Sequence, residues 1–191
     1  MAAAMTRVDN PAMQCRSMSW AAMGLTACLM VACSPTLDWR DVRLGPDTRL
    51  QFPCKPDRLE RKLPLLERVA AAQMLVCDGG GLTWSATVFD LGDPTLAPAA
   101  LLELRQRLLA NMQGTEEASE HVAVPGMTVG TLAQRSRMRG ARPDGSTTVA
   151  QALFVARGPR VYQLVVMARP DAPEQWSAQA AEFLDALSWR N

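Results

Sequence analysis

The sequence contains one histidine, His121, and no G-x-S-x-G motif. Nucleophilic catalysis needs a nucleophile next to a base that a third group orients, and the G-x-S-x-G turn is one signature of such a site. A lone histidine in an acidic segment does not provide this arrangement. No residue pattern points to a pair of catalytic carboxylates. We therefore predict no catalytic residues and no enzymatic activity.

Metal ligands are equally scarce. His121 lies close to Glu116, Glu117 and Glu120 in the sequence. Glu117 and His121 would share one face of a helix and bind a metal ion weakly, whereas zinc sites use several nitrogen or sulfur ligands. The favoured interpretation of residues 115–126 is a solvated acidic loop, and we predict no metal site.

The glycine-rich segment DGGG, residues 78–81, has no helix-like segment after it. A phosphate-binding loop needs a helix directly after its glycines, because the helix supplies the N–H groups and the dipole. The residues that follow, LTWSATVFD, are strand-like. We predict a hairpin turn at this position.

The uncharged N-terminal run is too short to span a membrane. Met18–Ala32 has 15 residues and follows Arg7 and Arg16, whereas a spanning helix needs about 20 apolar residues. An apolar run of this length behind basic residues is typical of a signal peptide. Its start codon corresponds to Met1 or to Met13.

The run ends in the residues MVAC, of which the last is Cys33, and this motif resembles the lipobox of bacterial lipoproteins. In those proteins the leader is removed just before the cysteine, whose thiol carries diacylglycerol and whose amine is acylated. Two alternatives stay open: cleavage before Cys28, after LTA, and an uncleaved anchor or ordinary secretion. The favoured prediction is a signal peptide at residues 1–32, a covalent lipid on Cys33 and no other cofactor.

The predicted lipid on Cys33 and the residue after it, Ser34, together predict where in the cell the protein lies. Two or more acyl chains hold a protein firmly on a membrane. In enterobacterial lipoproteins an aspartate after the lipidated cysteine signals inner-membrane retention, so the resemblance implies that Ser34 directs this chain to the periplasmic face of the outer membrane.

Residues 33–48 mix charge, proline and glycine without periodicity and are predicted to be a tether to a domain at residues 49–191. Within the tether, Trp39 is expected to pack on the domain rather than enter the membrane.

The predicted mature chain has no net charge. Removing Arg7, Arg16 and Asp9 with the leader from the 20 basic and 19 acidic residues leaves 18 of each sign. Neutrality provides no general attraction to nucleic acid, so we expect no nucleic-acid partner.

Cysteine usage agrees with export. Of the five cysteines, Cys15 and Cys28 lie in the predicted leader, and Cys33 takes the lipid. Cys54 and Cys77 remain, an even number in a compartment where disulfides form. We predict a Cys54–Cys77 disulfide, with two buried free thiols as the alternative.

Hydrophobic periodicity predicts an α+β fold. Period-2 and continuous apolar segments joined by turn residues predict antiparallel strands, and apolar residues at helical spacing predict two helices. The second helix has Asp171 as its N-cap and Glu174 as the partner in a capping box. The expected fold class is an antiparallel β-sheet flanked by these two main helices. The expected strands are residues 50–52, 58–66, 69–77, 82–91, 127–139, 147–157 and 161–169, and the helices are 97–112 and 171–187.

Three short motifs carry a family resemblance: LQFP at residues 50–53, GPRVYQL at 158–164 and FLDAL at 183–187. On these the chain resembles the PsbP-like superfamily over about residues 49–188. It also resembles uncharacterised betaproteobacterial-type lipoproteins, in which a cysteine follows Phe-Pro as Cys54 does here. The resemblance implies an α/β/α sandwich that serves as an assembly factor or binding module rather than an enzyme.

Arg135, Arg137 and Arg139 alternate along a predicted strand, and Arg142 follows them. Alternation places the first three side chains on one face of a sheet. Such a row would bind an anionic ligand, a lipid headgroup or an acidic partner. The favoured interpretation is nevertheless a solvated face or a charge-protected edge strand, with anion or partner binding as the alternative.

These observations predict a lipid-anchored, non-catalytic binding or assembly module of the cell envelope with an envelope protein as its partner. The alternative is a periplasmic carrier that holds a small apolar or anionic ligand between sheet and helix. A large apolar pocket would favour the carrier, and an exposed apolar patch would favour a protein partner.

Overall fold

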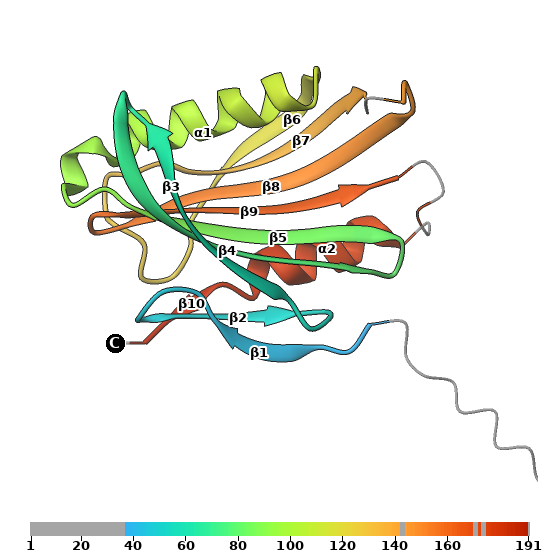
Figure 1. Ribbon diagram of the computed structural model, residues 1–191, viewed down its shortest axis with the longest axis horizontal. Coiled ribbons are helices and arrows are strands. Elements are labelled where there is room, and N and C mark those ends of the chain that lie inside the picture. The colour runs from blue at the N-terminus through green and yellow to red at the C-terminus, as the bar shows by residue number, and fades with distance from the viewer. Residues whose placement is uncertain (1–36, 142–143, 170–171, 173–174, 191) are drawn as a thin grey trace, which may run out of the picture. The chain divides into compact units, whose positions relative to one another are not determined.

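A seven-stranded antiparallel sheet forms the centre of the domain (Figure 1). The computed structural model describes residues 37–141, 144–169, 172 and 175–190, so the predicted leader, Cys33, Ser34, Arg142, Asp171 and Glu174 lie outside the described residues. The strands are β3 (Asp57–Leu65), β4 (Arg68–Gly79), β5 (Leu82–Asp90), β6 (Thr115–Val122), β7 (Ala133–Ala141), β8 (Thr147–Arg157) and β9 (Arg160–Ala168). Their spatial order is β3-β4-β5-β9-β8-β7-β6.

Two helices lie on opposite faces of this sheet, which confirms the α+β class. Helix α1 (Ala97–Asn111) follows a short 3₁₀ turn, η1 (Pro94–Leu96), and buries Leu104 and Leu108 against one face. Helix α2 (Trp176–Asp185) buries Phe183 against the other.

A smaller sheet accompanies α2, with β2 (Thr48–Phe52) between β1 (Arg40–Arg43) and β10 (Ser188–Trp189). Strand β1 lies within the segment expected to be a tether, so this part of that expectation is wrong. The short RDVR segment lacks an apolar pattern because Val42 is its one apolar residue; this side chain packs against the core, and pairing with β2 places the rest of the strand. Trp39 packs against Trp84 with ring centroids 6.0 Å apart, which confirms that it contacts the domain.

The core on the α2 side explains the period-2 pattern of the strands. Trp84, Phe52 and Phe183 are fully buried there. The ring of Phe183 makes edge contacts with Phe52 at 5.1 Å and Trp84 at 5.4 Å. Alternate residues of β5 and β9 point to this core and the remaining ones to α1, as expected of a sheet covered on both faces.

The disulfide expected from the cysteine count is present. Cys54, just after β2, is bonded to Cys77 of β4, with Cα atoms 6.2 Å apart. The bond connects the small sheet to the large one.

The DGGG segment forms the predicted turn. Gly80 and Gly81 have φ of 62° and 77° between β4 and β5, a conformation that favours glycine over residues with a Cβ. Strand β3 confirms the strand predicted at residues 58–66, and it tolerates Pro64 because it lies at the edge of the sheet.

The expected acidic loop at residues 115–126 is wrong for its first part, which forms β6 at the opposite edge of the sheet. Six of its eight residues are exposed, so it lacks the apolar alternation that identifies a strand. Strand β7 begins at Ala133 rather than at Met127. The preceding residues turn through Gly126 and Gly130, whose φ values are 84° and 83°.

Candidate functional site

The three alternating arginines of β7 lie on the face of the sheet that α2 covers. Arg135 forms an ion pair with Asp185 at the end of α2. The guanidinium carbon of Arg137 lies 5.2 Å from the centre of the Trp176 ring on the first turn of α2, a cation–π contact. The structure therefore brings together residues that stand about 40 to 50 positions apart in the sequence.

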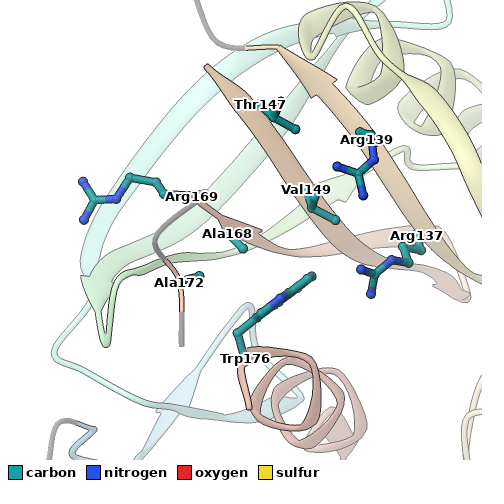
Figure 2. A pocket seen from close by; sticks show the side chains of 8 residues that line it. All are labelled: Arg137, Arg139, Thr147, Val149, Ala168, Arg169, Ala172 and Trp176. Carbon is teal, nitrogen blue, oxygen red and sulfur yellow. The ribbon is translucent and has the colours of Figure 1, made fainter. Parts of the chain in front are cut away.

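Next to these side chains is a hollow of about 390 Å³, which we call the arginine hollow. Figure 2 shows Arg137 and Arg139 pointing from β7 toward the space that Trp176 enters from α2, whereas Arg169 points away. Two guanidinium groups and an indole face therefore define its polar and aromatic sides. The lining residues are Arg137, Arg139, Thr147, Val149, Ala168, Arg169, Ala172 and Trp176.

A carboxylate of the protein already lies between the two guanidinium groups. Glu117 accepts hydrogen bonds from Nε of Arg137, at 3.2 Å, and from Nε of Arg139. The β6–β7 pairing passes from Glu116 directly to Ala118, so Glu117 is the extra residue of a β-bulge. Bulges redirect side chains, and this one places the Glu117 carboxylate on the α2 face.

The hydrogen bond from Arg139 lowers the pKa of Glu117 below its usual value. Desolvation raises this pKa, but the hydrogen bond from Arg137 and the charges of both arginines lower it further. The carboxylate is therefore ionised at neutral pH and offsets one of the two positive charges. The alternating pattern identifies the arginines but not Glu117 as their partner, because only the bulge places Glu117 on the same face.

The neighbouring Glu116 contacts α1, which lies on the opposite face of the sheet. It forms an ion pair with Arg105 of α1. Burial raises the pKa of Glu116, but the hydrogen bonds and positive charge of Arg105, together with the nearby Ser136 hydroxyl, lower it by more, so the pKa lies below its usual value. This pair connects α1 to the edge of the sheet.

His121 also lies away from the arginine hollow. With Leu102 and Leu132, which are 50% and 67% exposed, it lines a separate hollow of about 230 Å³ beside the start of α1. Among the residues that the structure describes, no three His, Cys, Asp or Glu side chains gather as a metal site requires.

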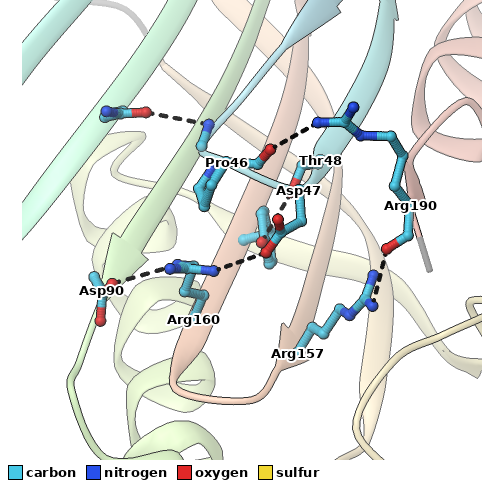
Figure 3. Close-up of polar contacts among 10 residues, drawn as sticks. Pro46, Asp47, Thr48, Asp90, Arg157, Arg160 and Arg190 are labelled. Atoms are coloured by element: carbon cyan, nitrogen blue, oxygen red, sulfur yellow. Dashed lines mark hydrogen bonds and ion pairs between the residues drawn. The ribbon is translucent and has the colours of Figure 1, made fainter.

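A second polar cluster is structural (Figure 3). Arg160 contacts both Asp47 and Asp90, each at 3.3 Å, and Arg157 donates to the backbone carbonyl of Arg190 at 3.3 Å. These contacts connect the β1–β2 turn and the C-terminal segment to β5, β8 and β9. Their role is to hold the two sheets together.

The chain is thus an α+β protein with an antiparallel sheet between two helices, one of which borders a cationic and aromatic hollow. Within the described ranges, no helix combines the length and hydrophobicity needed to cross a bilayer.

Comparison of the sequence with protein-family models and with curated proteins finds no match. Among solved structures, a protein of Bacteroides thetaiotaomicron VPI-5482 is similar with a TM-score of 0.45 and 12% identity over 75% of this chain and 45% of its own. This chain thus spans less than half of that protein. Protein PA94 of Pseudomonas aeruginosa, of unknown function, has a TM-score of 0.39 and 17% identity over 76% of this chain and 94% of its own. The Saccharomyces cerevisiae Ran-binding protein Mog1p has a TM-score of 0.45 and 12% identity over 80% of this chain and 95% of its own. These values identify neither a family nor a function.

Proposed function

We propose that this protein is a lipid-anchored, non-catalytic binding or assembly module of the bacterial cell envelope. Its lipid is attached to Cys33, it lies on the periplasmic face of the outer membrane, and its domain belongs with the PsbP-like sandwiches. The arginine hollow is the surface that contacts an anionic group of an envelope protein partner.

The position of Glu117 is the observation that carries this proposal. Its carboxylate fits between Arg137 and Arg139, so an aspartate or glutamate side chain of a partner has the right size and charge for the same position. Trp176 adds an aromatic face beside the two arginines. Tryptophan and arginine are the residue types that most often dominate the energy of protein interfaces.

Two further features support a protein partner in an exported location. The Cys54–Cys77 disulfide is typical of oxidising compartments. Leu102 and Leu132 are exposed apolar side chains that line the same hollow beside the start of α1, and gathered side chains of this kind mark interaction surfaces.

In-cell crosslinking with mass spectrometry tests the partner surface. We expect the charge-reversed variant Arg137→Glu/Arg139→Glu to lose the crosslinks that the native protein forms, and Arg137→Gln/Arg139→Gln to weaken them without adding repulsion toward Glu117. The matched control is Arg61→Glu/Lys62→Glu, which makes the same charge change on exposed β3. Crosslinks that persist in both β7 variants, with melting temperatures confirming that they fold, would remove the arginine hollow from the proposal.

Labelled palmitate tests the anchor. We expect incorporation into the native protein, none into Cys33→Ala, and loss of that variant from the membrane fraction. Palmitate incorporation at Cys28 instead would move the cleavage site, and no incorporation at either cysteine would refute lipid anchoring.

A further inference from the structure

Helix α1 leaves part of its face of the sheet uncovered. A groove of about 460 Å³ lies there, with β3 and α1 as its walls and β4, β5 and β9 as its floor. This volume falls within the range of about 300–1,000 Å³ that small-molecule sites occupy. The groove is on the opposite face from the arginine hollow.

The groove is lined mainly by apolar side chains that remain partly accessible. Leu63 of β3 and Met74 and Met167 of the floor are half-buried, although each faces the α1 side of the sheet. Methionine side chains are flexible and polarizable, so they adapt to ligands of different shape. Covering these groups with an apolar chain removes apolar surface from water, which favours binding.

A short polar stripe crosses the floor. Thr87 and Gln163 are opposite each other on β5 and β9, and Ser85 lies one position along the same face. The Ser85 hydroxyl donates to the carbonyl of Val165 at 3.4 Å. These hydroxyl and amide groups suit polar atoms that lie next to the apolar part of a ligand.

Arg107 is the charged residue among those that line the groove. Its Nη1 donates to the carbonyl of Pro64 at 2.6 Å, across the groove wall, and its other terminal nitrogen pairs with Glu103 one turn earlier. These two contacts hold the guanidinium at the rim and involve two of its five N–H donors. The remaining N–H donors of Arg107 are free to bond to a negatively charged group at the rim, where the Glu103 carboxylate already offsets part of the positive charge.

From this arrangement we infer that the groove binds a small anionic amphiphile, a single apolar chain joined to a carboxylate or phosphate. The apolar chain lies against Leu63, Met74 and Met167, and the charged head lies at Arg107. The inference extends beyond the proposed partner surface and does not depend on it.

Photo-crosslinking of the full-length protein in lipid nanodiscs tests this inference. The probes are photoreactive palmitate, photoreactive lysophosphatidylglycerol and an uncharged photoreactive monoacylglycerol, with adducts located by mass spectrometry. We expect one or both anionic probes to label β3, β4 and β9 peptides at the groove and to exceed the uncharged probe about tenfold, as expected for one charge-assisted hydrogen bond. Labelling by palmitate alone identifies a carboxylate ligand, and labelling by the phospholipid alone identifies a phosphate ligand.

Two variants make the test specific. Arg107→Gln should reduce labelling by the anionic probes to the level of the uncharged probe, and Met74→Glu/Met167→Glu should abolish it. The controls are Arg61→Gln on β3 and Val69→Glu on β4, neither of which lines the groove. Arg137→Glu/Arg139→Glu should leave labelling unchanged, which separates this site from the partner surface. Labelling spread evenly over the protein, or unchanged in Arg107→Gln, would overturn the inference.

Discussion

Removing the disulfide is expected to destabilise the domain by roughly 3 kcal/mol. Cys54 and Cys77 are 23 positions apart, so their bond closes a loop of about 24 residues in the unfolded chain. In the chain-entropy treatment, releasing a loop of this length raises the entropy of the unfolded state by an amount worth roughly 3 kcal/mol. Alanine at both positions leaves small apolar side chains behind, so the entropic effect should dominate in Cys54→Ala/Cys77→Ala.

Urea unfolding followed by tryptophan fluorescence measures this difference. Trp84 is fully buried and lies opposite Cys77 in the β4–β5 pairing, so it reports on the region that the bond connects. At a denaturant slope of about 2 kcal/mol/M, the midpoint should fall by roughly 1.5 M. Native protein treated with reductant should unfold at the same midpoint as the double variant.

Two results would refute this reasoning. A double variant within about 0.5 kcal/mol of the native protein would mean that the loop is already constrained in the unfolded state. Two alkylatable thiols in unreduced protein from cells would mean that the bond does not form there.

Three other predictions concern the core and the two glutamates of the bulge. Phe183→Ala should cost about 3–5 kcal/mol in thermal or urea unfolding, because its fully buried ring leaves a cavity between the sheet and α2. Glu116→Gln should lower stability by about 1 kcal/mol at pH 7, since its ionised carboxylate is bonded to Arg105. Its folded-state pKa is lowered, so this stabilisation is present above the ordinary value of 4.5 and is lost as pH falls through the lower folded-state pKa. Glu117→Gln should strengthen partner crosslinking, because it removes the charge that competes with the partner's carboxylate, whereas Glu120→Gln on the same strand should not.

For each of these three variants, one result would contradict the stated physical reason. Phe183→Leu should recover most of the lost stability, and an equal loss in both variants would argue against the cavity as the cause. A stability difference for Glu116→Gln that persists unchanged well below pH 4 would contradict the ion pair as its source. Weaker crosslinking in Glu117→Gln would indicate that Glu117 organises the arginine hollow instead of competing for it.

The strongly periodic segments could be predicted from the sequence. The apolar strands β8 and β9, the helix at α1 and the DGGG hairpin have signals that depend on neighbours two to four positions away. The disulfide followed from the number of cysteines that lie outside the predicted leader and the predicted lipidation site. The edge strands β1 and β6 were not predicted, because none of their residues is fully buried and neither strand shows the apolar alternation that identifies a strand from sequence.

The sites depend on contacts that no local pattern contains. Alternation alone placed Arg135, Arg137 and Arg139 on one face. Only the packing of α2 brought Trp176 beside them, and only the bulge in β6 brought Glu117 between them. The sequence by itself determined which faces of the helices and strands are apolar, because burial requires periodicity. Tertiary structure decided which charged and aromatic groups meet, because that depends on how distant elements stack rather than on the spacing of residues along any one of them.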